Sequence, residues 1–215
     1  MMKIMKKSIT DQMFSVLKEE IVRQRIKAGE QINPRQIAEE HGVSVMPVRD
    51  ALTRLASFGL VTIRPRVGFF AREFTPTEVR EIFEVRRLHE MYCMERYFHQ
   101  IDIAQLEQIA EAMDSFESNP SREAFDSIDE ALHDLLIAAS QNRFLMETYN
   151  HVKDLIILIR HLDLGRIDYS HAEHRQIVDA IRKGDKALSL TYLKQHLDSV
   201  RDSTLDSITV EESLA

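Results

Sequence analysis

The chain has 215 residues, of which 44% are apolar and 29% are charged, and its formal net charge is −7. These values are ordinary for a globular protein with one large core or two smaller ones. The longest aliphatic run, residues 155–159, is far too short to span a bilayer, and the basic N-terminus lacks the apolar segment of a signal peptide. The only cysteine, Cys93, excludes an intrachain disulfide, so we expect a cytoplasmic protein with no membrane association.

The charge is divided unevenly along the chain. Residues 1–74 contain 13 Lys and Arg against 8 Asp and Glu, whereas residues 75–215 contain 15 against 27. A basic segment beside an acidic one indicates two domains with different partners. We therefore expect a boundary after residue 74, with residues 1–74 as the domain that meets nucleic-acid phosphates.

The basic segment begins with a predicted helix over residues 8–27 that has one apolar side. A short helix over residues 35–40 follows, and Gly42 suits the tight bend after it. Ser44 is a typical N-cap for the next helix, because its hydroxyl can accept a bond from an unpaired backbone N–H group. Pro47 fits the first turn of that helix, where no donor is needed. Two short helices joined by a glycine turn are typical of a helix-turn-helix motif.

The second helix of this motif has one apolar face and one basic face. Val48, Leu52 and Leu55 recur at spacings of four and three, so they predict a buried stripe. Arg49 lies away from this stripe, on the outer face. An arginine-bearing outer face is what a recognition helix presents to DNA.

A β-hairpin is predicted directly after the motif. Gly59 ends the second helix, residues 60–63 and 69–71 read as two short strands, and the basic segment 64–68 forms the turn between them. The expected N-terminal domain is therefore a winged helix-turn-helix with a small β-hairpin wing.

The run GVSVMPVRDALTRLASFGLVTIRPRVGFF, residues 42–70, resembles the winged helix of GntR-type transcriptional regulators. It is most similar to the FadR/FCD branch, which carries an all-helical effector domain. The resemblance implies a cytoplasmic homodimer that binds a palindromic site in double-stranded DNA and responds to a small ligand.

The resemblance also implies DNA contacts at particular positions. Arg49 would reach a guanine edge with two bonds, and Arg35 would serve a base or a phosphate. Ser44, at the N-terminal turn of its helix, would meet a phosphate or a base edge. In the wing, Arg66 and Gly68 would follow the DNA backbone or enter the minor groove of the DNA.

Met46 stands where this chain departs from the family pattern. Relatives often carry Arg or Thr within residues 45–47, and apolar side chains here favour contact with a thymine methyl or less direct readout. For any one of the arginines predicted to contact DNA, the alternative is that it lies on a solvated helix face.

From residue 75 onward the sequence predicts only helices. Thr75, Pro76 and Glu78 form a helix start with a capping box, and Ser170 with Glu173 predicts a second capping box. Six helices are expected, over residues 76–100, 102–118, 121–140, 142–163, 170–183 and 185–208. The chain is therefore expected to be mainly α, with a C-terminal all-α six-helix bundle.

Four residues of this bundle have metal-ligating side chains in a suggestive pattern. Asp129 and His133 are four apart, so they share one helix face, and their flanks are apolar. His174 and His196 belong to two later helices that can converge on the same point in a bundle. One carboxylate with three imidazoles makes a divalent-metal site. The alternative is a satisfied Asp129–His133 pair with the other two histidines at the surface or at a helix cap.

The segments FDSIDEALHDLLIAASQN, EHRQIVDAIRKGD and LKQHL resemble the FCD domain in order and spacing. In the metal-binding members of that family, the matching positions ligate the metal, and they fall on Asp129, His133, His174 and His196. The resemblance thus implies a divalent cofactor, and the donor set suits zinc, nickel or manganese.

The same resemblance implies a pocket for a small carboxylate effector beside the metal. Arg86 matches an arginine that often faces this pocket, where a guanidinium could clamp a carboxylate with two hydrogen bonds. The alternative is a surface arginine paired with Glu90. Asn142 and Arg160 are further effector candidates, although Asn142 also suits a helix cap and Arg160 also suits the edge of the apolar run.

Together these features favour a ligand-responsive, DNA-binding transcriptional regulator, specifically a repressor, and not an enzyme. One alternative is an all-α metalloenzyme with a DNA-binding appendage, in which the metal activates water. Another is a direct metal sensor, in which the ion itself is the signal.

Overall fold

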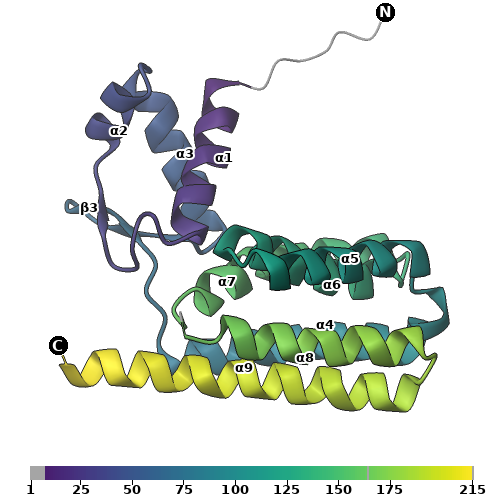
Figure 1. The fold of residues 1–215 in the computed structure, drawn as a ribbon. Coiled ribbons are helices and arrows are strands. Elements are labelled where there is room, and N and C mark those ends of the chain that lie inside the picture. The colour runs from purple at the N-terminus through teal and green to yellow at the C-terminus, as the bar shows by residue number, and fades with distance from the viewer. Residues whose placement is uncertain (1–7, 164, 215) are drawn as a thin grey trace, which may run out of the picture. The chain divides into compact units, whose positions relative to one another are not determined.

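The computed structural model describes residues 8–163 and 165–214, with side chains described as far as residue 208. The chain divides into two compact units, Met1–Phe74 and Thr75–Ala215. Figure 1 shows the elements of both units.

The first unit opens with α1, Ile9–Val22, which is shorter than the predicted helix over residues 8–27. Ser8 caps its N-terminus by accepting a hydrogen bond from the backbone N–H of Asp11. The helix ends early because Gln24 adopts a positive φ of 57°, which an α-helix cannot contain.

The helix-turn-helix is formed by α2, Pro34–Glu40, and α3, Val45–Ser57. Gly42, with φ of 64°, makes the bend between them. Asn33 caps α2, and Ser44 occupies the predicted N-cap position of α3 in extended geometry, but its side chain does not make the predicted capping hydrogen bond. Its hydroxyl is exposed instead.

A three-stranded antiparallel sheet completes this unit, in the order β1-β3-β2. The predicted hairpin is present as β2, Val61–Arg64, and β3, Gly68–Ala71, with Arg64 opposite Gly68. The sequence did not predict β1, Gln31–Ile32, because two residues are too few to show an alternating pattern.

The second unit contains six α-helices and one short 3-10 segment within the described residues, which confirms the predicted all-α bundle. Thr75 and Glu78 form the predicted capping box at its first helix. The elements are α4 Pro76–Tyr97, η1 Phe98–Gln100, α5 Ile103–Ser118, α6 Arg122–Ala138, α7 Arg143–Arg160, α8 Ile167–Arg182 and α9 Lys186–Leu214.

The start of α8 differs from the prediction. The helix begins three residues earlier, so the backbone N–H of Ser170 already donates to the carbonyl of Arg166 within the first turn. Ser170 therefore does not cap this helix, and the predicted capping box with Glu173 is wrong. The carboxylate of Glu173 instead binds Arg166 and His196.

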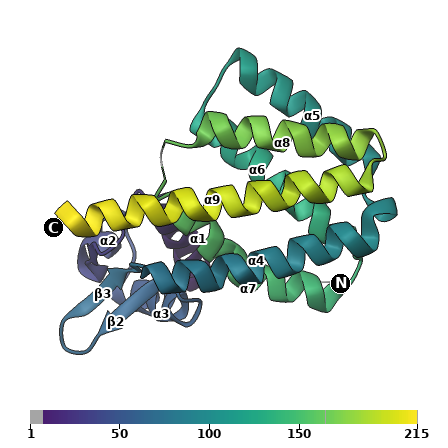
Figure 2. The ribbon, with the colours of Figure 1, turned by 90° about the horizontal axis from the view of Figure 1, so that it is seen from below.

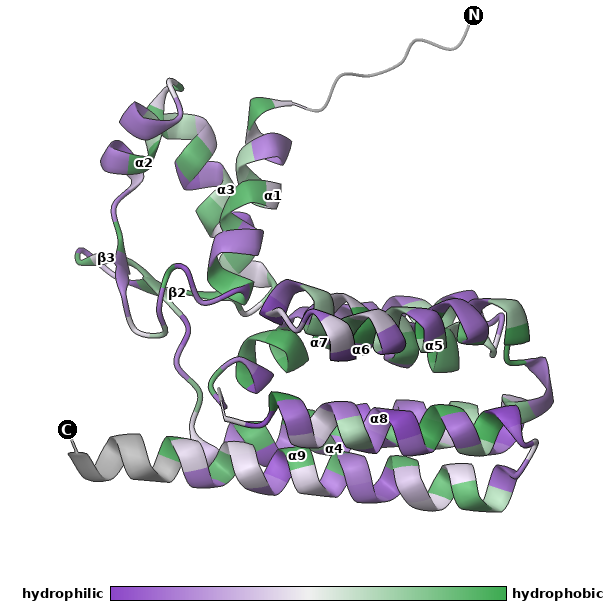
Figure 3. Cartoon of the chain, in the orientation of Figure 1, coloured by the Kyte–Doolittle hydropathy of each residue, from purple (hydrophilic) through white to green (hydrophobic). Residues whose placement is uncertain are grey.

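The core of the bundle lies where α4, α5, α6, α8 and α9 meet. In Figure 2, α9 runs beside both α4 and α8, and the packing of these helices agrees with that view. Hydrophobic and hydrophilic segments alternate along most helices in Figure 3, as amphipathic packing requires. The largest apolar cluster includes Met94, Leu106, Met113, Leu132, Leu136, Val178 and Leu193.

None of the described helices combines the length and the hydropathy that crossing a membrane requires.

Candidate metal centre and nucleic-acid interface

Three histidines from three helices meet inside the bundle. His133 lies on α6, His174 on α8 and His196 on α9, and their side chains are at most 3% exposed. The ring centroids of His174 and His196 are 4.4 Å apart, and each lies 5.3 Å from that of His133. One ligand atom from each ring lies within 4.8 Å of the others, which is the spacing of a shared metal site.

Asp129 lies one helical turn before His133 on the same face of α6. Its Oδ1 atom is 3.5 Å from Nε2 of His174 and 3.9 Å from Nε2 of His133. Its other carboxylate oxygen forms an ion pair with Arg160. The structure thus brings together all four residues that the sequence predicted as ligands.

The outer nitrogens of two of the rings are held by carboxylates. Nδ1 of His133 lies 2.7 Å from Oε2 of Glu90, and Nδ1 of His196 lies 2.8 Å from Oε2 of Glu173. An ionised carboxylate only accepts hydrogen bonds, so each Nδ1 carries the proton. In a neutral ring, Nε2 is then the atom with the free lone pair, and Nε2 is the atom that faces the shared centre.

Burial keeps these imidazoles in the neutral form that binds metals. It lowers the pKa of His174 and His196 well below the ordinary value, and neighbouring cationic groups add to the effect. Burial also lowers the pKa of His133, although Glu90 opposes that shift. A ligand that is already deprotonated does not have to release a proton before it binds an ion.

The residues present fit a divalent cation. Oδ1 of Asp129 and Nε2 of His133 are buried and hydrogen-bonded to none of the described residues. Leaving such a group unsatisfied costs about 1–3 kcal/mol, so native structures seldom do so without reason. Both atoms face the histidine cluster, where a cation would use their lone pairs. Three imidazoles and one carboxylate are an established donor set for zinc, and they also accept other first-row metals.

Arg86, predicted as an effector ligand, lies on α4 in the bundle interior. Its side chain is 1% exposed, and its Nε donates to Oε1 of Glu90 over 2.8 Å. The alternative was therefore right about the pairing with Glu90 but wrong about a surface location. Its Nη1 is buried and hydrogen-bonded to none of the described residues. The hydroxyl of Tyr149 also donates to Glu90, over 3.0 Å.

Glu90 is consequently the centre of a buried polar network. Burial alone would raise its pKa, but Arg86 and His133 together hold the pKa well below the usual range. Sequence reasoning named this residue only as the partner of Arg86. Its spacing of four residues from Arg86 was the available signal, but nothing in the sequence showed that His133 and Tyr149 converge on the same carboxylate.

The other two effector candidates occupy different environments. Arg160 ends α7, is 8% exposed, and bridges Asp129 and Asp126, donating to Asp126 over 3.0 Å. Asp126 also lies 3.0 Å from Nε2 of His161. Asn142 is exposed and caps α7 by accepting bonds from two backbone N–H groups, which is the structural role anticipated for it.

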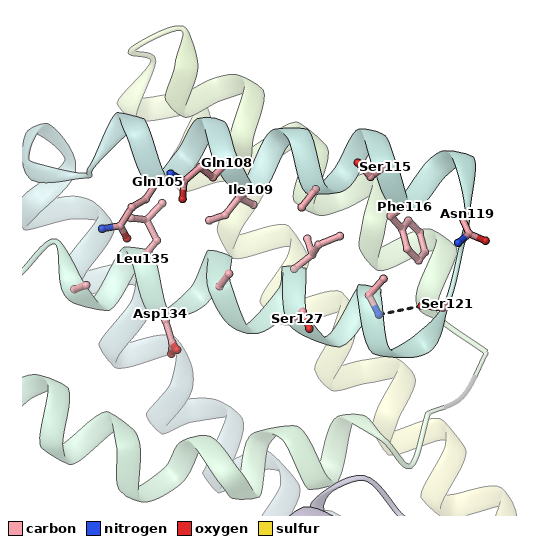
Figure 4. A pocket seen from close by; sticks show the side chains of 15 residues that line it. Gln105, Gln108, Ile109, Ser115, Phe116, Asn119, Ser121, Ser127, Asp134 and Leu135 are labelled. Carbon is pink, nitrogen blue, oxygen red and sulfur yellow. Dashed lines mark hydrogen bonds between the residues drawn. The ribbon is translucent and has the colours of Figure 1, made fainter.

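Two of the hollows in the second unit lie against α6 and differ greatly in size. A cavity of about 20 Å³ lies near Arg160 and Phe125, at the edge of the polar cluster. An open groove of about 1110 Å³ lies between α5 and α6 (Figure 4). Ser127, Ala131 and Asp134 line the groove from the face of α6 opposite to His133, so it does not hold the predicted metal ligands.

In the first unit, several predicted DNA contacts gather on one surface. Arg35, Arg49 and Gly68 line the same hollow of about 370 Å³. The guanidinium carbon of Arg49 lies 5.8 Å from the centre of the Phe69 ring. The remaining predicted contacts, Ser44, Met46 and Arg66, are exposed, and Met46 is 64% exposed.

A second arginine on α3 has a different role. Arg54 forms a 3.0 Å ion pair with Asp11 and lies 4.1 Å from the centre of the Phe14 ring, so it links α3 to α1. No such ion pair is found for Arg49 among the described residues. Arg49 therefore remains available to a partner, as a recognition helix requires.

Comparison with known families assigns most of the chain. Residues 81–199 match the FCD domain, and residues 9–71 match the family described as bacterial regulatory proteins, gntR family. The matches together cover both units of the structure.

Characterised and uncharacterised regulators share this arrangement. The gluconate operon transcriptional repressor of Bacillus subtilis is 28% identical over 211 residues, which cover 93% of this chain and 86% of the relative. The uncharacterised regulator YdhC of the same organism is 29% identical over 194 residues, which cover 87% of each chain.

Solved structures agree with the fold. A GntR transcriptional regulator from Rhodococcus sp. RHA1 has a TM-score of 0.83 at 19% identity, covering 93% of this chain and 99% of that one. The Zn²⁺-bound FCD domain of the regulator TM0439 has a TM-score of 0.60 at 34% identity, covering 63% of this chain and 97% of that one.

Proposed function

This chain belongs to the GntR family of bacterial transcriptional regulators and carries an FCD domain, and from that premise we propose that it is a ligand-responsive repressor. Its first unit, residues 1–74, reads DNA. Its second unit, residues 75–215, binds a divalent metal ion and a small carboxylate effector and joins two subunits. As a regulator of bacterial transcription it acts in the cytoplasm, and neither the family nor the relatives are enzymes.

The convergence of three buried imidazoles and Asp129 on one point carries this proposal. Burying such a polar cluster costs free energy, and a cation at its centre would offset that cost by binding the lone pairs that face it. Zinc is the first candidate, since the 34% identical FCD domain of TM0439 is Zn²⁺-bound. When bound, the ion supplies positive charge and open coordination positions for an anion.

The charges around the centre support an anionic effector. Three arginines and four carboxylates surround the centre: Arg86, Arg160, Arg166, Glu90, Asp126, Asp129 and Glu173. With neutral histidines these side chains carry a net charge of about −1, so a divalent cation would make the net charge of the cluster positive. Arg86 keeps Nη1 without a partner among the described residues while Nε holds Glu90. A carboxylate that entered the site would accept a hydrogen bond from that N–H and so give the buried Nη1 group a partner.

DNA recognition is proposed to use α3 and the wing. Arg49 reads a guanine edge, Arg35 contacts a base or a phosphate, and Arg66 in the wing follows the backbone. Ser44, Met46 and Gly68 complete the contact surface. Two such units in a homodimer would read a palindromic operator, because a two-fold protein matches a two-fold site.

The proposed metal binding is tested with the purified full chain. Native mass spectrometry with elemental analysis should find one divalent ion per chain, which EDTA removes. A protein that stays metal-free after dialysis against Zn²⁺, Ni²⁺ and Mn²⁺ would contradict the proposal. Anisotropy with DNA from its own promoter region, with and without metal, separates a cofactor from a metal that is itself the signal.

A further inference from the structure

Two glutamates on separate helices contact the histidine cluster in the same way. Glu90 on α4 holds Nδ1 of His133, and Glu173 on α8 holds Nδ1 of His196, over 2.7 and 2.8 Å respectively. Both bonds lie on the side of the ring away from the shared centre.

Each glutamate is itself held by an arginine. Oε1 of Glu90 accepts from Nε of Arg86 over 2.8 Å. Nη2 of Arg166 lies 2.6 and 2.7 Å from the two oxygens of Glu173, and it also lies 2.6 Å from Oγ of Ser199 on α9. An arginine bound in this way keeps the carboxylate ionised and fixes its orientation.

The third histidine lacks such a partner. Nδ1 of His174 is buried and hydrogen-bonded to none of the described residues. Its ring instead stacks on Phe125, with centroids 5.9 Å apart and planes 11° from parallel. Packing can fix the position of a ring, but it does not select which nitrogen carries the proton.

We propose that Glu90 and Glu173 are positioning residues that fix the Nδ1–H tautomer of His133 and His196, and thereby present both Nε2 lone pairs to the metal. The inference rests on the proposed metal site but concerns two residues that are not ligands. Arg86 and Arg166 act one step further out, by holding the two carboxylates. Carboxylate partners of this kind orient the ring and raise the basicity of the ligating nitrogen.

Glu173→Gln is the sharper test, because Glu90 lies in a fully buried network whose loss endangers folding. The amide keeps the shape of the carboxylate, but its NH₂ group can donate to Nδ1 of His196. That bond favours the tautomer with the proton on Nε2, which removes the lone pair the metal needs. Glu117→Gln is a matched control, since Glu117 also contacts one histidine and one arginine, His171 and Arg175, away from the cluster.

Histidine ring ¹H–¹⁵N correlation spectra of the metal-free full chain read the tautomers directly. His196 should be the Nδ1–H form in the wild type and in Glu117→Gln, and should shift toward the Nε2–H form in Glu173→Gln. A wild-type protein with the proton of His196 on Nε2 would overturn the inference, whether or not the protein binds metal.

Co²⁺ titration followed by the visible d–d spectrum measures the consequence. Glu173→Gln should bind Co²⁺ about 10- to 100-fold more weakly than the wild type with an altered spectrum, and Glu173→Asp should recover part of the affinity. Equal affinity and an unchanged spectrum in a folded Glu173→Gln protein would overturn the positioning role alone. Failure of the wild type to bind any metal would instead contradict the proposed metal site itself.

Discussion

Nε2 of His174 lies 3.2 Å from Nε2 of His196, inside a core where both side chains are essentially unexposed. Because Nδ1 of His196 donates to Glu173, its Nε2 is a bare acceptor, and the contact is favourable only if Nε2 of His174 carries a proton. Nδ1 of His174 is then a buried acceptor that bonds to none of the described residues. A cation at the centre would bind both Nε2 lone pairs, so the contact between these two atoms would no longer need a proton on His174.

Removing this central imidazole should abolish tight metal binding. We expect His174→Ala to lose at least about 100-fold in Zn²⁺ affinity, since a ligand matters more than an outer-sphere partner, whose loss costs about 10- to 100-fold. His99→Ala is the control, because His99 is exposed in η1. Competition titration with a chromophoric chelator measures both affinities. Undiminished Zn²⁺ affinity in His174→Ala would place the metal elsewhere.

Arg49, for which no ion pair is found among the described residues, should carry DNA specificity. Arg49→Ala should weaken binding to the cognate operator by about 1–3 kcal/mol and reduce discrimination against unrelated DNA. Arg54→Ala removes the same side chain from the same helix, but Arg54 binds Asp11 and packs on Phe14. The control should therefore lose some stability but little specificity. Fluorescence anisotropy with operator and scrambled duplexes gives both values, and equal losses in the two variants would contradict the assigned role of Arg49.

Substitution of Arg86 by lysine should affect effector binding more than metal binding. Arg86→Lys keeps the buried charge, but an ammonium cannot hold Glu90 through Nε and offer a second fixed N–H to a ligand. Zn²⁺ should still bind, whereas the thermal stabilisation of the zinc-loaded protein by its carboxylate effector should require at least about 10-fold more ligand. Differential scanning fluorimetry against a panel of small mono-, di- and tricarboxylic acids tests this. If the variant responds like the wild type, Arg86 is a structural partner of Glu90 only.

An ion-pair cluster between α4 and α9 predicts a pH dependence that does not involve the metal site. Burial would raise the pKa of Asp198, but Lys194 and Arg87, each 2.8 Å away, and Arg201 lower it below 3.8. A depressed carboxylate pKa stabilises the fold above the unfolded value, and this contribution is lost as pH falls through the folded pKa.

Asp198→Asn should therefore reduce the free energy of unfolding by up to about 1 kcal/mol at pH 7, since the partners are partly exposed. The difference from the wild type should shrink as pH falls below 3.8. Urea unfolding at pH 7, 5 and 3 measures it. A difference that grows toward pH 3 would reverse the predicted sign.

Much of the fold could be predicted because local patterns decide it. The stripe Val48, Leu52 and Leu55 is fully buried in α3, and the Thr75–Glu78 capping box marks the start of α4 as expected. The failures occurred where tertiary structure decides. Ser170 looked like an N-cap, yet α8 starts before it, and β1 is too short to leave a pattern.

The candidate site, like the fold, could be predicted only in part from the sequence. The four predicted ligand positions follow from spacing and family resemblance, because Asp129 and His133 must share a helix face. The carboxylates that hold the rings could not be derived, since Glu90 reaches His133 across 43 residues of sequence. Periodicity shows which face of a helix is buried, but it does not show which buried polar groups of different helices meet.

In the proposed function, occupancy of the histidine cluster changes the affinity for DNA. The most direct measurement is an anisotropy titration of zinc-loaded full-length protein on DNA from its own promoter region, with and without the carboxylate that stabilises it most in the thermal screen. We expect a change in DNA affinity of about 5- to 150-fold that disappears in His174→Ala. An effector that saturates the zinc-loaded protein and leaves its DNA affinity unchanged would contradict it.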